Sequence, residues 1–241
     1  MLIMTNKIEI NKNLKKLLQS GKRFDSFRGG DGKLYWIKTH ERFMLKHLIK
    51  GHPTRALKRE LDGISLLKEI NIPVPDVVYG DDRCIVTKDA GRNLQDIIYD
   101  TSVSDESKKN IFIAAGKMMA NLHQQGYAHG GLALRDTCWD GSEITFLDLE
   151  SFDGSIKSHR QISIDFYLFI HSWFRLFEKD RPELIAFIDA YKDNINGVQW
   201  QNFIHISIFH KILCRLCSFF KFHNTDMIAF TRSINFLSAF K

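Results

Sequence analysis

The alternation of apolar and polar residues near the start of the chain predicts a β-hairpin. Residues 23–28 alternate, the glycine-rich stretch 29–32 is typical of a turn, and residues 33–38 form a second alternating segment that ends in Lys38. The preceding residues 8–18 carry isoleucines and leucines among lysines, which suits either an amphipathic helix or a first strand. The pattern therefore places a lysine at the end of a short strand.

A helix and a second hairpin follow. A basic linker, residues 39–58, leads into residues 59–69, whose apolar positions recur at helical spacing and place Glu60 beside the apolar stripe. Two prolines stop this helix because neither can continue it. Strands at 77–79 and 84–87 come next, separated by a polar turn.

The remainder of the chain has a mainly helical pattern. A long helix is predicted over 105–125, ending at Gly126. Four more helices are predicted at 162–177, 183–192, 200–222 and 227–236. A β-rich first part and a helical remainder favour an α+β, two-lobed architecture, with lobes at 1–88 and 89–241 and a ligand bound between them.

Composition and charge narrow the function classes. The chain has 241 residues, of which 44% are hydrophobic and 26% charged, as in globular proteins. The net charge of +6 favours either an anionic partner or simple solubility. Four scattered cysteines and the lack of a signal-peptide pattern indicate a reduced, cytoplasmic protein. No stretch reaches the ~20 apolar residues of a membrane span, so any membrane contact is expected to be peripheral.

The stretch 127–150 carries the strongest candidate chemistry. It contains a histidine, a glycine pair and Arg135-Asp136, then turns at Asp140-Gly141 and ends in an apolar strand that presents Asp148. A loop and a hairpin that each end in a carboxylate form a layout for holding a divalent cation between Asp136 and Asp148.

This stretch resembles the catalytic segment of the protein-kinase-like fold, as found in aminoglycoside phosphotransferases and bacterial lipopolysaccharide (Kdo or heptose) kinases. The pattern there is H-G-D-x-x-x-x-N, followed by an apolar run that ends in a metal-binding Asp. Laid on this chain without gaps, it places the histidine at His129, the two metal ligands at Asp136 and Asp148, and the catalytic Asp at Gly131.

The resemblance implies an ATP site in the first lobe. Lys38 would contact the nucleotide phosphates and Glu60 would orient it; each could instead be an ordinary solvent-exposed side chain. A phosphate-binding glycine would be Gly21, in a turn between the first two strands. Thr87 and Lys88 would form the hinge whose backbone holds the adenine edge.

Three more residues take expected roles from the resemblance. Asp165 would brace the catalytic loop by accepting its backbone amides, or would be an acid near a helix N-terminus that the helix dipole favours. His129 would pack below the site. Arg135 would stabilise transferred charge or pair with a nearby acid, or would form a surface ion pair of little energetic weight.

The glycine at position 131 leaves the function open between alternatives. A glycine cannot accept the proton of an acceptor hydroxyl. Asp136 could take over this role, because phosphoryl transfer depends mostly on positioning and charge neutralisation. Alternatively the chain is a catalytically silent nucleotide-binding protein or scaffold, or the loop is a different motif.

The leading hypothesis is an ATP- and Mg²⁺-dependent phosphotransferase that acts on a hydroxyl of a small molecule or glycolipid, such as a lipopolysaccharide core. The basic linker and the net charge suit an anionic acceptor and peripheral contact with the inner membrane face. The basic linker lacks interleaved aromatic residues, which argues against nucleic-acid binding. Zinc binding by Cys214 and Cys217 with His205 and His210 is a weak candidate, since a single C-x-x-C pair is not specific. The phenylalanines between 203 and 240 are expected to form core.

Overall fold

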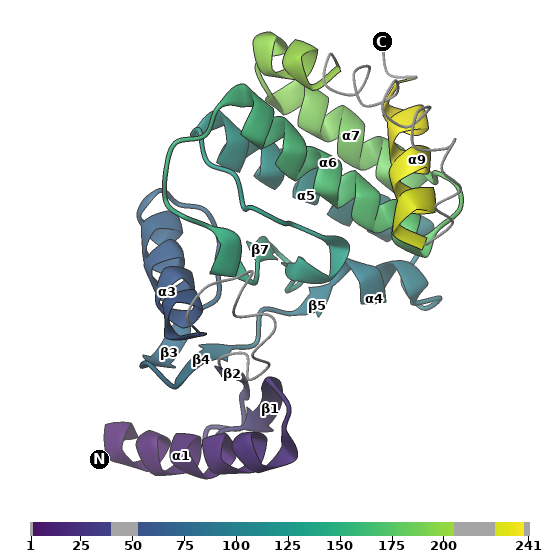
Figure 1. The fold of residues 1–241 in the computed structure, drawn as a ribbon. Coiled ribbons are helices and arrows are strands. Elements are labelled where there is room, and N and C mark those ends of the chain that lie inside the picture. Colours follow the sequence, from purple (N-terminus) through teal and green to yellow (C-terminus); the bar gives the residue numbers. More distant parts are fainter. Residues whose placement is uncertain (1, 40–52, 205–224, 239–241) are drawn as a thin grey trace. The chain divides into compact units, whose positions relative to one another are not determined.

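The computed structural model describes residues 2–39, 53–204 and 225–238. The chain divides into two compact units, the first made of Met1–Gly91 with Leu147–Asp153 and the second of Arg92–Phe146 with Gly154–Lys241. The first unit contains a four-stranded antiparallel sheet and the second is mainly helical (Figure 1). The predicted α+β architecture, β-rich first and helical afterwards, is confirmed.

The sheet of the first unit is built from the two predicted hairpins. Its strands are β1 (Phe24–Arg28), β2 (Leu34–Thr39), β3 (Val77–Gly80) and β4 (Cys84–Lys88). All neighbours are antiparallel and the order is β1-β2-β4-β3, so β2 pairs on both sides. Helix α3 (Pro53–Glu69) connects the two hairpins and begins inside the segment predicted as a linker, because proline is well tolerated in the first turn of a helix.

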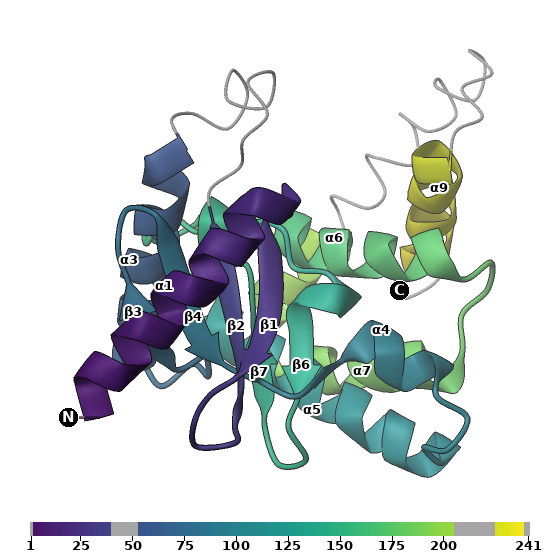
Figure 2. The same cartoon turned by 90° about the horizontal axis from the view of Figure 1, so that it is seen from below.

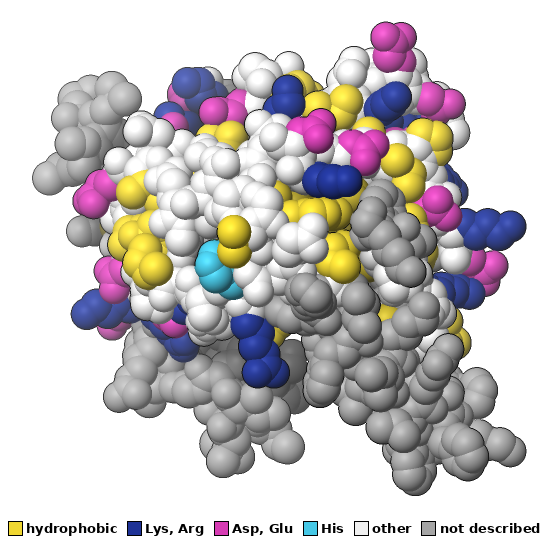
Figure 3. All heavy atoms as spheres, turned by 90° about the horizontal axis from the view of Figure 1, so that it is seen from above, with side chains coloured by type: hydrophobic (Ala, Val, Ile, Leu, Met, Phe, Trp, Pro, Cys, Tyr) yellow, Lys and Arg dark blue, Asp and Glu magenta, His cyan; other side chains and the backbone are white. Residues whose placement is uncertain are grey.

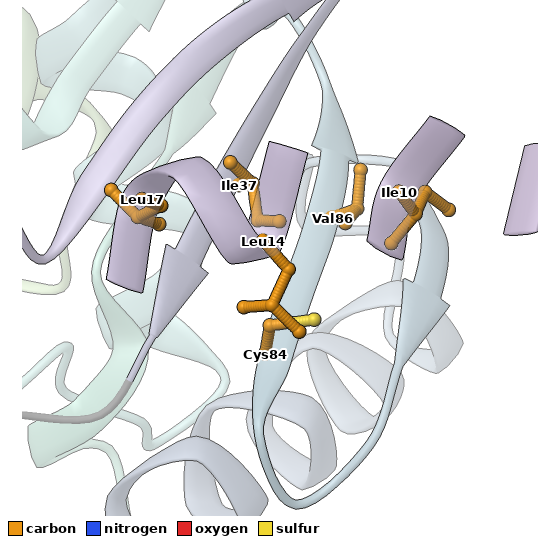
Figure 4. Close-up of a cluster of buried hydrophobic side chains, with 6 residues drawn as sticks. All are labelled: Ile10, Leu14, Leu17, Ile37, Cys84 and Val86. Carbon is orange, nitrogen blue, oxygen red and sulfur yellow. The ribbon is translucent and has the colours of Figure 1, made fainter. Parts of the chain in front are cut away.

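Residues 8–18, which suited a helix or a strand, belong to helix α1 (Leu2–Ser20). This helix crosses one face of the sheet (Figure 2). Its buried side chains are spaced by three or four residues, as a helical stripe requires. They pack with residues of β2 and β4 in one cluster (Figure 4), which comprises Ile10, Leu14, Leu17, Ile37, Cys84 and Val86. Burial also raises the pKa of the Cys84 thiol to about 12, so this cysteine is inert.

The period of the strand determines where Lys38 points. Ile37 is buried in the cluster beneath α1, and successive side chains on a strand point to opposite faces. Lys38 therefore lies on the face opposite α1, where it pairs across the ladder with Phe24 of β1. The same hydrophobic cluster that anchors α1 thus sets the direction of the lysine.

The short segment 147–153 packs with the first unit, although the sequence placed it in the C-terminal lobe. It forms the 3₁₀ turn η2 (Leu149–Ser151). A Cβ atom added to Gly63 of α3 would lie 2.8 Å from Phe152 Cδ1 and 3.5 Å from Leu149 Cβ. Gly63 therefore permits this segment to rest against α3, and this packing brings Asp148 into the first unit.

The second unit combines a small sheet with a helical bundle. Its three-stranded sheet has the order β5-β6-β7, with the strands at Arg92–Asn93, Thr137–Trp139 and Ile144–Phe146. The helices are α4 (Leu94–Tyr99), α5 (Asp105–Gln124), the 3₁₀ turn η1 (Leu134–Asp136), α6 (His159–Leu176), α7 (Pro182–Asn194) and α9 (Thr225–Leu237). The predicted helices at 105–125, 162–177, 183–192 and 227–236 are confirmed, as is the turn at Asp140-Gly141.

The core of the second unit is aromatic. Phe166 packs against Tyr191 with ring centroids 4.1 Å apart, and Phe169 stacks on Phe187 at 4.2 Å. These contacts join α6 to α7, and α5 lies beside both (Figure 1). A Cβ added to Gly116 of α5 would lie 2.3 Å from the carbonyl oxygen of Phe187, so glycine is required where α5 and α7 cross.

Several predictions fall on residues that are not described. The zinc candidates Cys214, Cys217, His205 and His210 lie outside the described residues, as do positions 40–52 of the basic linker. The predicted helix at 200–222 is described only up to residue 204. None of the described helices is long and apolar enough to cross a membrane. On the face drawn in Figure 3, lysines and arginines stand next to acidic side chains at several places.

Asp76 offers a pH-dependent test of the first unit. Its carboxylate contacts Lys68 Nζ at 2.6 Å and Lys88 Nζ at 2.9 Å, which ties the end of α3 to the end of β4. The hydrogen bonds from Lys68 and then Lys88 lower the pKa of Asp76 to about 2. Because the pKa is lower in the folded state, this stabilisation is present above about pH 4 and is lost as the pH falls towards 2.

We expect Asp76→Asn to lower the stability by less than about 1 kcal/mol at pH 7, because the pair is half-exposed and screened by solvent. The difference from wild type should vanish near pH 2 in urea titrations followed by circular dichroism. The exposed turn variant Asp82→Asn serves as the control. A deficit for Asp76→Asn that stays constant from pH 7 to pH 2 would contradict this assignment.

Candidate functional site

Lys38 is the centre of a charged cluster in the first unit. Its Nζ lies 2.8 Å from Glu60 Oε2, 2.7 Å from Asp148 Oδ1 and 3.1 Å from Glu150 Oε1. The expected pairing of Lys38 with Glu60 is therefore present, and Asp148 joins it. Contact of these residues with a nucleotide stays a prediction.

Each carboxylate is placed by a different local structure. Glu60 lies on α3 one turn from Leu57 and Ile64, both buried, so the apolar stripe of the helix carries the acid towards the sheet. Asp148 follows β7 with φ 62° and ψ 57°, a left-handed conformation. Aspartate tolerates this conformation better than most residues. The sharp bend lets the chain leave the strand and present the carboxylate to Lys38.

Arg23 and Glu150 belong to the cluster but were not predicted from the sequence. The Arg23 guanidinium pairs with Glu150 Oε1, the same oxygen that Lys38 approaches. Glu150 reaches the cluster because η2 begins directly after Asp148 and places both acids near the lysine. The spacing Asp148-Leu149-Glu150 was the available signal, whereas nothing local in the sequence connects Arg23 to a residue 127 positions away.

Two cations face three carboxylates in this cluster, which leaves one negative charge in excess when all five groups are ionised. The side chains of Glu60 and Glu150 are 9% and 8% exposed. Burial raises the pKa of Glu60, and the neighbouring Lys38 opposes this rise. The excess charge and the buried acids favour the entry of a further cation.

The oxygen donors fit a divalent metal ion. Glu60, Asp148 and Glu150 each offer a carboxylate oxygen, and these oxygens lie within 4.8 Å of one another. Oxygen ligands of this kind are those that Mg²⁺ prefers. The ammonium of Lys38 provides positive charge between them.

Asp136 and Arg135 lie in the second unit. Asp136 is buried in η1, and Arg135 Nε is 3.5 Å from its Oδ1 while the arginine side chain is 68% exposed. An ion pair with one partner in solvent contributes little to stability, and this was the alternative role given for Arg135. That Asp136 shares a cation with Asp148, or acts on an acceptor, stays a prediction.

Asp165 braces the loop that carries the glycine pair, which confirms the role implied by the resemblance. The amide of His129 donates to Asp165 Oδ2 at 2.8 Å, and the amides of Gly130 and Gly131 donate to Oδ1 at 2.9 and 3.1 Å. Asp165 is almost completely buried and lies beyond the first turn of α6, so the alternative of an acid in the N-terminal turn that the helix dipole favours is excluded. Burial by itself would raise the pKa of Asp165, but hydrogen bonding to His123 and the loop amides lowers it overall.

The glycine pair is required by the backbone of this loop. Gly130 has φ +90° and Gly131 has φ +159°, conformations that strain residues with a Cβ atom. Successive amides that turn towards one anion form a nest, and Asp165 fills it here. Apart from its two chain neighbours, none of the described residues places an atom within 4 Å of a Cβ built on Gly131, so the constraint is conformational and not one of space.

A buried hydrogen-bond chain continues from Asp165 to α7. His123 Nε2 lies 3.2 Å from Asp165 Oδ2, and His123 Nδ1 lies 2.7 Å from the Tyr191 hydroxyl. A neutral histidine satisfies both neighbours when Nε2–H donates to the carboxylate and Nδ1 accepts from the tyrosine. Burial raises the pKa of Tyr191, so its hydroxyl keeps the proton that it donates. His129 packs edge-on against Phe146, as its expected structural role requires.

The expected phosphate glycine occupies different surroundings from those predicted, and the expected hinge residues Thr87 and Lys88 lie at the end of β4. Gly21 lies between α1 and β1 and not in a turn between two strands, because residues 8–18 are helical. Thr87 pairs with Trp36 and with Val77 in the sheet. The amide of Lys88 donates to the carbonyl of Asp76 at 2.9 Å. A role of Gly21, Thr87 and Lys88 in binding a nucleotide stays a prediction.

Comparison with known proteins shows a similarity by sequence. A Haemophilus influenzae protein, described as an uncharacterized protein, is 30% identical over 208 residues, which are 84% of this chain and 84% of that protein. Among solved structures, the apoenzyme of macrolide 2'-phosphotransferase MphH from Brachybacterium faecium is similar with a TM-score of 0.41 and 12% identity, over 93% of this chain and 98% of that chain. No protein-family model matches the chain.

The Asp165 brace predicts a large loss of stability on a near-isosteric substitution. In the wild type, the loop amides and His123 all donate to the Asp165 carboxylate. Asp165→Asn would replace one acceptor oxygen by an NH₂ donor, so some of these buried donors would lose their partner. We expect a loss of about 3 kcal/mol, measured by urea denaturation at pH 7. Asp189→Asn, on the exposed side of α7, should change the midpoint little. Equal midpoints for the two variants would show that the brace is not needed.

Proposed function

We propose that this chain, which belongs to the same family as the Haemophilus influenzae protein, is an ATP-dependent phosphotransferase that uses Mg²⁺ and acts on a hydroxyl group. The observation that carries the proposal is the cluster around Lys38. A lysine presented by a rigid strand, held by a helix glutamate and adjoining a carboxylate that follows a hairpin, combines the parts needed to bind phosphates and a metal ion.

Each residue of the first unit would have a distinct role. Lys38 would contact the phosphates of the nucleotide, and Glu60 would keep the lysine extended towards them. Asp148 would bind Mg²⁺, which neutralises phosphate charge when it is present. Thr87 and Lys88 would line the remainder of the nucleotide site.

The acceptor would be bound by the second unit. We propose Asp136 as a further metal ligand that also faces the acceptor hydroxyl, with Arg135 beside it to stabilise the transferred charge. Because phosphoryl transfer depends chiefly on positioning and charge neutralisation, a site without a carboxylate at Gly131 can still function. The net charge of +6 supports an anionic acceptor, such as a phosphorylated glycolipid of the lipopolysaccharide core, at the cytoplasmic face of the inner membrane.

A silent nucleotide-binding protein is the second candidate, and the loop at Gly131 favours it. That residue carries no side chain to accept a proton, and its amide is already bonded to Asp165. A protein of this kind would bind nucleotide through Lys38 without transferring phosphate.

Removal of the Asp148 carboxylate tests both candidates. We expect Asp148→Asn to lower the Mg²⁺-dependent affinity for ADP and the turnover of ATP about 100-fold or more, because a carboxylate ligand of the metal is lost. Calorimetry with ADP and Mg²⁺ measures binding without an acceptor, and phosphate release across a panel of alcohol acceptors measures turnover. Asp62→Asn, exposed on α3, is the matched control.

The outcomes separate the alternatives. Wild-type binding and turnover that Asp148→Asn abolishes would support the phosphotransferase. Wild-type binding of ADP without turnover on any acceptor would support the silent protein. Absence of ADP binding by the wild type, or equal binding by the two variants, would exclude both.

A further inference from the structure

The turn at Gly21 lies at the wrong end of a helix to bind a phosphate. Helix α1 ends at Ser20, whose hydroxyl donates to the carbonyl of Leu17 at 2.9 Å, and Gly21 follows with φ +69°. The C-terminal end of a helix carries a partial negative charge and presents carbonyl groups. A phosphate at Gly21 would therefore be repelled, and the backbone amides of a helix N-terminus are not available there.

Arg23 is the first cationic side chain after this turn that reaches the Lys38 cluster. Its carbonyl accepts the amide of Thr39 at 2.8 Å and the Thr39 hydroxyl at 3.3 Å. Its Nε also donates to the Thr39 carbonyl at 3.4 Å. Since Thr39 is buried and directly follows Lys38, these bonds hold the arginine in a fixed place beside the lysine.

The two cations converge on a single carboxylate oxygen. Glu150 Oε1 is paired with the Arg23 guanidinium and lies 3.1 Å from Lys38 Nζ. Arginine and lysine bind carboxylate and phosphate oxygens with the same kind of charge-assisted hydrogen bond. The side chains of Arg23 and Lys38 are 25% and 20% exposed, so solvent reaches both. An anion is thus already bound between them, and this anion is part of the chain.

We propose that Arg23 is a phosphate-binding residue of the nucleotide site and that Glu150 occupies the phosphate position while no nucleotide is bound. The inference rests on the proposed function. A nucleoside polyphosphate would displace the Glu150 carboxylate from the two cations, and Arg23 would supply the contact that the turn at Gly21 cannot. Glu150 therefore competes with the ligand, whereas Arg23 binds it.

This assignment predicts opposite effects for the two partners of one ion pair. Arg23→Gln should weaken the binding of ADP with Mg²⁺ about tenfold, the effect of losing one charge-assisted hydrogen bond. Arg23→Lys should keep part of the affinity, because the charge remains without the guanidinium fork. Glu150→Gln should strengthen the binding of tripolyphosphate without Mg²⁺ several-fold, because the internal competitor loses its charge. Lys22→Gln, which removes the same charge from the neighbouring exposed residue, should bind as the wild type does.

The experiment measures the affinity of the wild type and these four variants for ADP with Mg²⁺ and for inorganic tripolyphosphate, with the melting temperature of each. An Arg23 that merely supports the fold would give weaker binding and lower melting temperatures in both Arg23→Gln and Glu150→Gln. That result, or equal affinities for Arg23→Gln and Lys22→Gln, would overturn the inference while leaving the proposed function intact.

A wild type that binds neither probe would remove the proposed function and this inference together. Arg23-dependent binding of tripolyphosphate without binding of ADP would keep the phosphate site and exclude the nucleotide. Binding of both probes that Arg23→Gln weakens, together with metal-free tripolyphosphate binding that Glu150→Gln strengthens, is the expected result.

Discussion

A buried carboxylate must meet positive charge or hydrogen-bond donors, and the first unit meets this requirement with Lys38 at the centre and Arg23 beside Glu150. Glu60, Asp148 and Glu150 would repel one another at these separations, and Lys38 is the cation placed between them. The lysine is directed there by the alternation of β2, whose preceding residue Ile37 is buried under α1. The packing of a hydrophobic helix on one face of the sheet and the charge balance on the other face are therefore consequences of the same strand register.

The second unit satisfies the same requirement in a different way. Asp165 is more deeply buried than the acids around Lys38, yet its partners are three backbone amides and His123. Backbone amides cannot move away without unfolding the loop, whereas the ammonium of Lys38 sits on a flexible stem. The Asp165 site is thus suited to hold a loop in one shape, and the Lys38 site is suited to exchange one partner for another. This difference in partner chemistry separates a structural acid from candidate binding acids better than burial does.

The sequence was sufficient where a single element contains the signal. Alternation and turn residues located both hairpins, and helical spacing located α3, α5, α6 and α7. Residues 8–18 stayed ambiguous because their isoleucines and leucines among lysines fit both the helical and the strand period. The helix is decided by packing, since Ile10, Leu14 and Leu17 bury their side chains against the sheet. The candidate site divides similarly. Local pattern and resemblance were enough to select Lys38, Glu60 and Asp148. The pairing of Arg23 with Glu150, however, forms only because residues 147–153 pack on α3 at Gly63, and no sequence pattern marks this glycine as a contact site.

The backbone at Gly131 bears on the proposed replacement of a catalytic carboxylate by glycine at this position. A simple loss of a carboxylate would leave a loop ready to receive one again, but a loop with φ +90° and φ +159° at consecutive residues is specialised for glycine. An aspartate at 131 would either strain the backbone or withdraw an amide from Asp165, and both cost stability of the brace. The loop therefore has no side chain at position 131 that could accept a proton, and its amide there is used to hold Asp165. In a phosphotransferase of this construction, rate would have to come from positioning and charge neutralisation around Lys38 and Asp148, with proton transfer left to another group or to water.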